Sequence, residues 1–167
     1  YSKLARLCEE ILKKDENNQK ALTYLMYAYC DFGQYHLVLR TADKILRLNP
    51  KNSHPYNCKA MVHLVRGEYK NALLLADEGL KIAESHDLKK TRIEALISLE
   101  RFDEAYEFFK SQNISEYNFT NAIIRCGKYS QIPKYGSDLS EKELLGYLFE
   151  RCRYLERKGT HSEILEV

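Results

Sequence analysis

The sequence is poor in glycine and proline, has no tryptophan and contains no long apolar run. Its 167 residues include 7 Gly and 3 Pro, and apolar residues recur at helical spacing almost throughout, which indicates an all-α chain. No apolar stretch approaches the ~18 residues of a membrane span. The 26 basic and 24 acidic side chains nearly cancel, unlike the strong basic excess of a nucleic-acid-binding domain. We therefore expect neither a membrane nor a nucleic acid as partner.

Sequence patterns that support catalysis are also missing. The closest two glycines, Gly127 and Gly136, are nine positions apart, so no glycine-rich phosphate loop exists. His54, Cys58 and His63 could share one helix face, but a structural zinc site needs a fourth ligand, which the spacing does not supply. We predict no catalytic residue, no metal site and no cofactor.

Cysteine is present but not paired in sequence. The chain has 5 cysteines, an odd number with no CxxC spacing, and all lie in apolar helical patterns: Cys8, Cys30, Cys58, Cys126 and Cys152. This usage favours free thiols in a reducing compartment over a disulfide framework. We therefore expect the protein in the cytoplasm or the nucleus.

A repeat organises the first two thirds of the chain. Gly33-Gln-Tyr35 recurs one period later as Gly67-Glu-Tyr69, and the apolar and small residues on both sides recur at the same offsets. The same spacing relates Leu4, Val38 and Ala72, and a step shorter by a single position leads to Ala105. A period of about 34 residues is typical of helical repeat proteins.

These positions resemble the tetratricopeptide repeat (TPR), a helix–turn–helix unit with a Gly-x-Tyr signal, small residues at helix contacts and a closing proline, here Pro50. The resemblance implies an all-α, right-handed superhelix of stacked antiparallel helix pairs, an α-α solenoid. Each unit would consist of a helix A followed by a helix B. Gly33 and Gly67 would end their A helices in the left-handed conformation.

The repeat pattern divides the chain in two. Residues 1–112 are expected to form regular TPR-like units, a half unit followed by about three full ones, with Arg92-Ile93 departing from the pattern in the third. Residues 113–167 are expected to form degenerate TPR-like helices, including one opened by the capping box Ser140-Glu-Lys-Glu143. Because both ends fall inside repeat units, we interpret the chain as a piece of a longer array.

The resemblance also implies a binding groove, since TPR proteins bind partners on the face lined by their A helices. The residues carried over to this groove are Lys20, Thr23, Tyr27, Asn57, Met61, Leu64, Val65 and Lys90. Thr23, Tyr27 and Cys58 stand where chaperone-binding TPR proteins place a carboxylate clamp. The groove is apolar and aromatic instead, which suits a helix or a folded surface.

Two basic clusters are present: Lys89-Lys90-x-Arg92, which includes the groove residue Lys90, and Arg151-x-Arg153 with Arg157-Lys158. We interpret both as solvated helix faces, the second one complementing a helix dipole. The alternative is a docking site for an acidic partner segment.

A closer resemblance is to the amino-terminal arm of the TPR subunits of the anaphase-promoting complex, of the cell-division-cycle sixteen or twenty-seven class. It rests on Gly33-Gln-Tyr-His36, Pro55-Tyr-Asn-Cys-Lys59, Gly67-Glu-Tyr-Lys-Asn-Ala-Leu73 and Leu139-Ser-Glu-Lys-Glu-Leu-Leu-Gly-Tyr-Leu-Phe-Glu150. It implies a non-catalytic scaffold within a ubiquitin ligase of the cell cycle, with other protein subunits as partners and an arm that forms homodimers.

Exposed apolar surface would support the same self-association. The expected dimer residues are Leu4, Leu7, Tyr27, Met61, Leu64 and Val65. Two other functions remain open from the sequence: a peptide-receptor TPR module in targeting or chaperone work, and a docking domain of an enzyme whose catalytic part lies elsewhere.

Overall fold

The computed structural model describes residues 3–112, 114, 119–135, 145–146 and 149, and no strand occurs among them. The helices are α1 (Lys3–Lys14), α2 (Gln19–Asp31), α3 (Tyr35–Leu48), α4 (His54–Val65), α5 (Tyr69–Ile82), α6 (His86–Ser98), α7 (Phe102–Gln112), α8 (Phe119–Arg125) and α9 (Ile132–Tyr135), with the 3₁₀ turn η1 (Tyr129–Gln131) before α9. The expected all-α class is confirmed.

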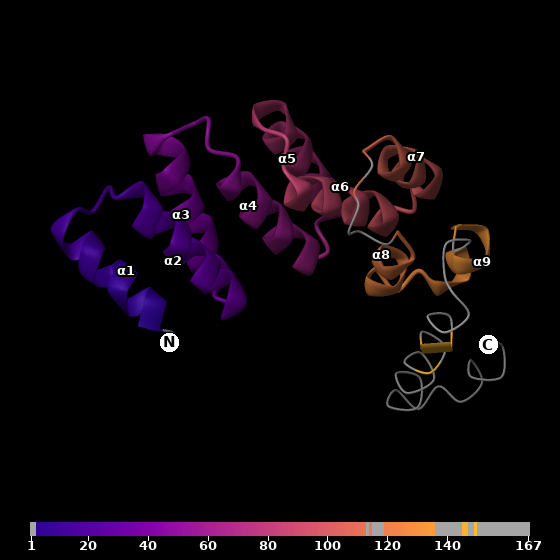
Figure 1. The fold of residues 1–167 in the computed structure, drawn as a ribbon, viewed down its shortest axis with the longest axis horizontal. Coiled ribbons are helices and arrows are strands. Elements are labelled where there is room, and N and C mark those ends of the chain that lie inside the picture. The colour runs from indigo at the N-terminus through magenta and orange to yellow at the C-terminus, as the bar shows by residue number, and fades with distance from the viewer. Residues whose placement is uncertain (1–2, 113, 115–118, 136–144, 147–148, 150–167) are drawn as a thin grey trace. The chain divides into compact units, whose positions relative to one another are not determined.

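The chain forms two compact units, Tyr1–Ser115 and Glu116–Val167. In the first unit, each of the helices α1 to α6 packs against the next one along the chain, up to α7, and α4 also contacts α2 and α6 (Figure 1). Helices α2, α4 and α6 are the A helices of the repeat, and α1, α3, α5 and α7 are the B helices. This is the helix-pair stack that the repeat period predicted.

The turns between the first units share one hydrogen bond. The amide of Asn18 donates to the carbonyl of Asp15 (3.1 Å), and the amide of Asn52 donates to that of Asn49 (3.2 Å). The side chain of Asn18 then caps α2 by accepting from the amide of Ala21 (3.1 Å). The polar residues between helices thus satisfy backbone groups that the helix ends leave unpaired.

The A helices α2, α4 and α6, and also α8 in the second unit, end in one backbone motif. Gly33, Gly67 and Gly127 have φ values of 66°, 75° and 68°, and Glu100 takes the same conformation with φ 63°. At each site the following residue donates its amide to the carbonyl five positions back, for example Arg101 to Leu96 (2.9 Å), the pattern of a Schellman cap. The third unit therefore keeps the turn although it lacks the glycine.

Small side chains let the helices of the first unit pack closely. Ala42, Ala60, Ala72, Ala76 and Ala105 are fully buried, as the repeat pattern predicted. Together with Ala42, larger side chains fill the space between α2, α3 and α4, in a cluster that contains Leu22, Met26, Val38, Ile45, Cys58 and Val62.

At Gly79 the contact is closer still. A Cβ atom built there would lie 2.8 Å from Leu88 Cδ1 and 2.9 Å from Tyr56 Cβ. No side chain fits this junction of α4, α5 and α6 without displacing a neighbour.

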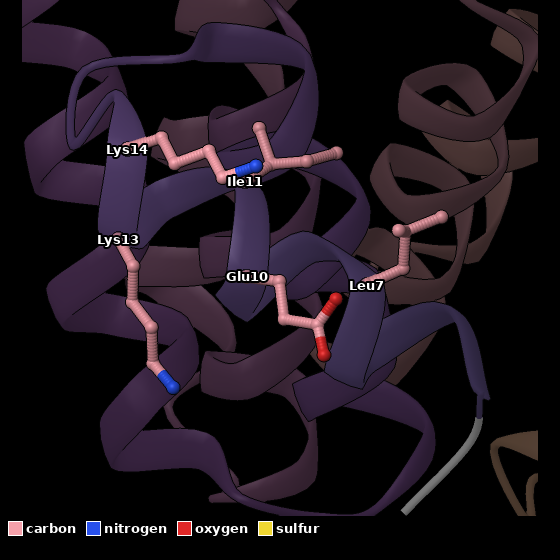
Figure 2. A pocket seen from close by; sticks show the side chains of 5 residues that line it. All are labelled: Leu7, Glu10, Ile11, Lys13 and Lys14. Carbon is pink, nitrogen blue, oxygen red and sulfur yellow. The ribbon is translucent and has the colours of Figure 1, made fainter.

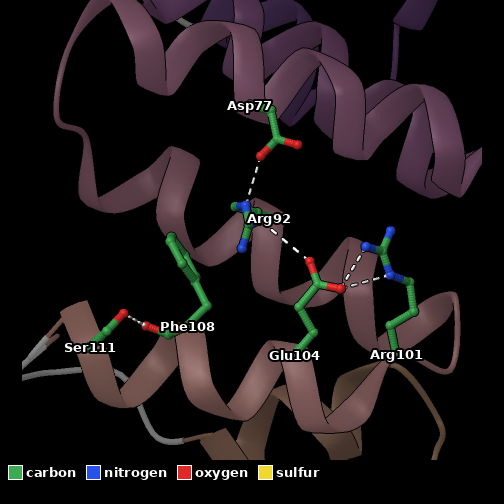
Figure 3. Close-up of polar contacts among 6 residues, drawn as sticks. All are labelled: Asp77, Arg92, Arg101, Glu104, Phe108 and Ser111. Atoms are coloured by element: carbon green, nitrogen blue, oxygen red, sulfur yellow. Dashed lines mark hydrogen bonds and ion pairs between the residues drawn. The ribbon is translucent and has the colours of Figure 1, made fainter.

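Arg92 explains why the third unit departs from the repeat. Its Nε donates to Asp77 Oδ1 of α5 (2.7 Å), and its Nη2 lies 3.6 Å from Glu104 Oε1 of α7. The guanidinium also stacks over the Phe108 ring, 4.1 Å from the centroid (Figure 3). An ion-paired, aromatic-stacked arginine thus joins α5, α6 and α7.

The second unit is described only in part. Phe119 and Tyr135 meet edge to face with ring centroids 5.9 Å apart, and Ala122 and Ile123 are buried in the same unit. After Gly127 the chain forms η1 and the short α9, where the repeat pattern would place the start of a B helix. The expected capping box at Ser140–Glu143 and the basic cluster around Arg151–Lys158 lie outside the described residues.

Candidate functional site

The three A helices of the first unit form one continuous surface. α4 contacts both α2 and α6, and all three run in the same direction because each follows a B helix of opposite direction. We call the surface shared by α2, α4 and α6 the A face. It carries the residues that the sequence placed in a partner-binding groove.

The first cross-link on the A face joins α2 to α4. The hydroxyl of Tyr27 and Nδ1 of His54 are 2.6 Å apart, and their rings meet edge to face at 6.0 Å. Burial, and after it the charges that Cys58 and Asp87 would carry nearby, raise the pKa of Tyr27 to about 12. The phenol is therefore neutral near pH 7 and holds the two helices in register.

The second cross-link joins α4 to α6. The hydroxyl of Thr91 donates to Asn57 Oδ1 (2.8 Å), and Asn57 Nδ2 lies 3.7 Å from Met61 Sδ. Asn57 is only 8% exposed. The sequence assigned Asn57 to partner contact, but its amide is already used inside the protein, so it supports the A face instead of offering a free group.

Other predicted groove residues remain accessible. Met61 is 45% and Val65 63% exposed, whereas Leu64 is half-buried beside them on α4. On α2, Lys20 is exposed and Thr23 is half-buried, and on α6 Lys90 is half-buried. The A face thus presents apolar side chains from α4, on the same side of that helix as His54 but two and three turns farther along.

Two cysteines meet between α2 and α4. Hydrogen bonding between the half-buried Cys30 thiol and the buried Cys58 thiol lowers the pKa of Cys30 and raises that of Cys58. Cys8, Cys30, Cys58 and Cys126 are free thiols in the structure, as the sequence predicted, and Cys152 lies outside the described residues.

His54, Cys58 and His63, which we considered as zinc ligands from the sequence, each contact different residues. His54 bonds Tyr27, Cys58 is buried in the core, and His63 Nδ1 lies 2.6 Å from Glu68 Oε2. That contact with His63 lowers the pKa of Glu68. Within the described part of the chain, no group of three or more potential ligands is arranged to hold a metal ion.

The remaining predicted dimer residues belong to another surface. Leu4 is 49%, Leu7 53% and Ile11 36% exposed, and their spacing places them in a stripe along α1. Next to it lies a hollow of about 300 Å³, bordered by Leu7, Glu10, Ile11, Lys13 and Lys14 (Figure 2). One repeat later, Val38 and Ile45 occupy the positions of Leu4 and Ile11 and are fully buried. The α1 stripe is therefore apolar surface of the kind that the repeat elsewhere covers with a helix.

The basic cluster at the start of α6 is integrated into the fold. Lys89 is buried and its Nζ lies 3.0 Å from Glu84 Oε2, while Arg92 pairs with Asp77 and Glu104. The expected solvated face is therefore wrong for Lys89 and Arg92, because both side chains are largely buried, and their ion pairs also argue against docking of an acidic partner there. A search for membrane spans in the described residues found no helix with sufficient length and apolar character.

No family model and no curated protein matches the sequence. Solved structures do match the fold. Against YrrB, "a TPR protein with an unusual peptide-binding site", the TM-score is 0.64 at 17% identity, over 97% of this chain and 89% of that one. A crystal structure of MamA gives 0.61 at 18% identity, over 94% and 90%.

The Arabidopsis OM64 TPR domain gives a TM-score of 0.57 at 19% identity, over 66% of this chain and 95% of that one. In a further MamA structure the match spans 66% of that chain, just under two thirds of its length. At these identities the comparisons establish that the chain has the TPR-like helical-repeat fold.

Proposed function

We propose that the protein is a non-catalytic interaction module whose A face receives a segment of a partner protein. The observation that carries this proposal is the accessible apolar pair Met61 and Val65, which lies on the same side of α4 as His54, two and three helical turns farther along. Large exposed apolar side chains are typical of protein-binding surfaces. YrrB, a TPR protein of the same fold with "an unusual peptide-binding site", adds support.

The composition of the A face indicates the kind of segment. The exposed Met61 and Val65 carry no charge, and no carboxylate clamp was found at Thr23, Tyr27 or Cys58. An amphipathic helix or an apolar extended segment fits this face better than a charged peptide tail does. The free thiols of the chain are consistent with a function in the cytoplasm or the nucleus.

Site-specific cross-linking tests this function. The full chain is prepared with a photoreactive phenylalanine analogue at Met61, and in a matched control at Leu74, which is 58% exposed on α5. After irradiation in cell extract, mass spectrometry identifies the cross-linked peptides. We expect Met61 to capture a defined segment of one partner, with apolar residues at helical or alternating spacing, and Leu74 to capture none. Equal capture at the two positions, or none at Met61, contradicts the proposal.

A second candidate is a scaffold that forms homodimers, as in the anaphase-promoting complex of the cell cycle. The sequence resemblance supports it, and so does the exposure of Leu4, Leu7, Met61 and Val65. In a closed two-fold pairing, each copy would cover these apolar surfaces of the other.

Sedimentation tests the dimer directly. We expect the purified chain to sediment as a dimer at micromolar concentration and Val65→Glu to sediment as a monomer with unchanged helicity. Leu74→Glu is the control, because its position is similarly exposed but lies outside the proposed interface. A monomer of 19.6 kDa at all concentrations contradicts this candidate.

A further inference from the structure

A second surface, remote from the A face, combines a hollow with a row of cations. The hollow has a volume of about 270 Å³ and is lined by Leu22, Tyr29, Leu37, Arg40, Thr41, Lys44 and Arg47. We call it the α2–α3 hollow. Tyr29 lies about 200° around α2 from Tyr27, so the hollow and the A face lie on different sides of that helix.

Three of its lining residues form a basic stripe on α3. Arg40, Lys44 and Arg47 follow one another at spacings of four and three positions, which places them on one face along about 10 Å of helix. None of the three ion-pairs with any residue that the structure describes. Elsewhere in the first unit Lys59, Lys89 and other cations do pair with carboxylates.

The stripe is not a requirement of the repeat. One unit later, on α5, the corresponding residues are Leu74, Glu78 and Lys81. Like charges four positions apart destabilise a helix, and at the corresponding positions of α5 no such pair occurs. Packing therefore does not account for this concentration of positive charge on α3, whereas an anionic partner would.

The apolar residues that line the hollow indicate which class of anionic partner it fits. Leu22, Tyr29 and Leu37 supply apolar surface between α2 and α3. A volume of 270 Å³ falls below the ~300–1,000 Å³ of a small-molecule pocket, but it accommodates a side chain. A phosphate backbone or a lipid headgroup would use the cations and leave the apolar floor unused.

We propose that the α2–α3 hollow docks an acidic amphipathic segment of a partner protein. An apolar side chain of that segment packs on Leu22, Tyr29 and Leu37, and carboxylates on either side of it pair with Arg40, Lys44 and Arg47. The surface acts independently of the A face, so the same molecule can bind a second segment there.

Peptide selection followed by binding measurements tests the proposal. A random peptide library displayed on phage is selected on the full chain and on the double variant Arg40→Glu/Lys44→Glu. We expect a class of peptides that carry Asp or Glu around a Leu or Phe, enriched on the wild type and absent from the double variant. In fluorescence anisotropy, these peptides should bind the double variant at least about tenfold more weakly.

The controls separate this surface from a general anion site. Lys81→Glu, at the position matching Arg47 in the next unit, should change the affinity less than about twofold, and circular dichroism should show all variants to be folded. The proposal is overturned if no acidic class is enriched, if Lys81→Glu is as damaging as the double variant, or if changing the peptide's Leu or Phe to Ser has no effect. It is equally overturned if single-stranded DNA, or vesicles of phosphatidylserine and phosphatidylcholine, displace the peptide from the stripe.

Discussion

A single side chain, Arg92, links three helices of the first unit. Its side chain is 18% exposed, and it joins Asp77 of α5 to Glu104 of α7 while stacking on Phe108. Arg101 pairs with the same Glu104 but is 49% exposed and lies only three positions away from it. The two arginines share a partner and differ in burial, so they form a matched pair.

Replacing Arg92 should therefore cost far more than replacing Arg101. We expect Arg92→Ala to lower the free energy of unfolding by about 2 kcal/mol, because Asp77 loses its hydrogen-bonded partner and the Phe108 ring loses the stacked guanidinium, whereas Glu104 keeps Arg101. Arg101→Ala should cost less than about 1 kcal/mol, as for an exposed ion pair. Urea denaturation of both variants measures the difference, and equal losses would show that the Arg92 network does not bind the third unit together.

The raised pKa of Tyr27 predicts a loss of stability in alkali. In the unfolded chain Tyr27 ionises near pH 10, whereas in the folded chain its pKa is about 12. The stabilisation is complete below pH 10 and declines as the pH rises to 12, since only the unfolded chain releases the proton in this range.

Comparison with Tyr27→Phe isolates this effect from all other titrating groups. Near pH 9 the variant should be less stable by about 1 kcal/mol, because it lacks the hydrogen bond to His54. In urea unfolding experiments the gap should close as the pH rises above 10 and reverse in sign before pH 12, because the rise in the pKa of Tyr27 from about 10 to about 12 outweighs the hydrogen bond. A gap that stays constant would mean that Tyr27 titrates normally in the folded protein.

At the scale of elements, the ends of the A helices decide how well each unit is formed. Gly33 and Glu100 occupy the same left-handed position in two different units, with φ 66° and 63°. No atom lies within 4 Å of a Cβ built at Gly33, so substitution there changes only the backbone preference. A side chain in this conformation costs roughly 1–2 kcal/mol.

Reciprocal substitutions should have opposite signs. We expect Gly33→Ala to destabilise the protein by about 1 kcal/mol and Glu100→Gly to stabilise it by up to about the same amount. Thermal unfolding followed by circular dichroism measures both. Destabilisation by Glu100→Gly would indicate that the contacts of the glutamate side chain outweigh the strain of its backbone.

At the scale of the whole molecule, the first compact unit contains a buried core of its own. Two apolar clusters of its described residues lie between Ala5 and Val62, Leu88, Ile93 and Leu96 are fully buried farther along, and α5 to α7 extend the same stack. We expect a fragment of residues 1–115 to fold alone and to unfold cooperatively, because each helix pair is stabilised by its neighbours in the stack. Circular dichroism during urea unfolding tests this, and a broad, non-cooperative transition would show that the fragment is not an autonomous unit.

The sequence alone determined the class and the repeat of this protein. The repeat period, the helical spacing of apolar positions, and Gly33 and Gly67 at helix ends are local signals, and each was found where it was expected. They are readable because backbone preference and the amphipathic pattern act within one or two helices. The left-handed conformation of Glu100 was not predictable from these local signals, because glutamate does not favour that conformation. The hydrogen bonds of the turn impose it.

The tertiary structure decided which side chains are free to bind. The sequence placed Asn57 in the groove, but its side-chain oxygen accepts a hydrogen bond from Thr91 of the next A helix. Likewise, Lys89 and Arg92 form ion pairs within the fold. Conversely, the sequence did not single out Arg40, Lys44 and Arg47. They become a candidate binding surface because Leu22 and Tyr29 of α2 line the same hollow. Such contacts join residues distant in sequence, and a pattern along one helix does not specify what its neighbour brings to the interface.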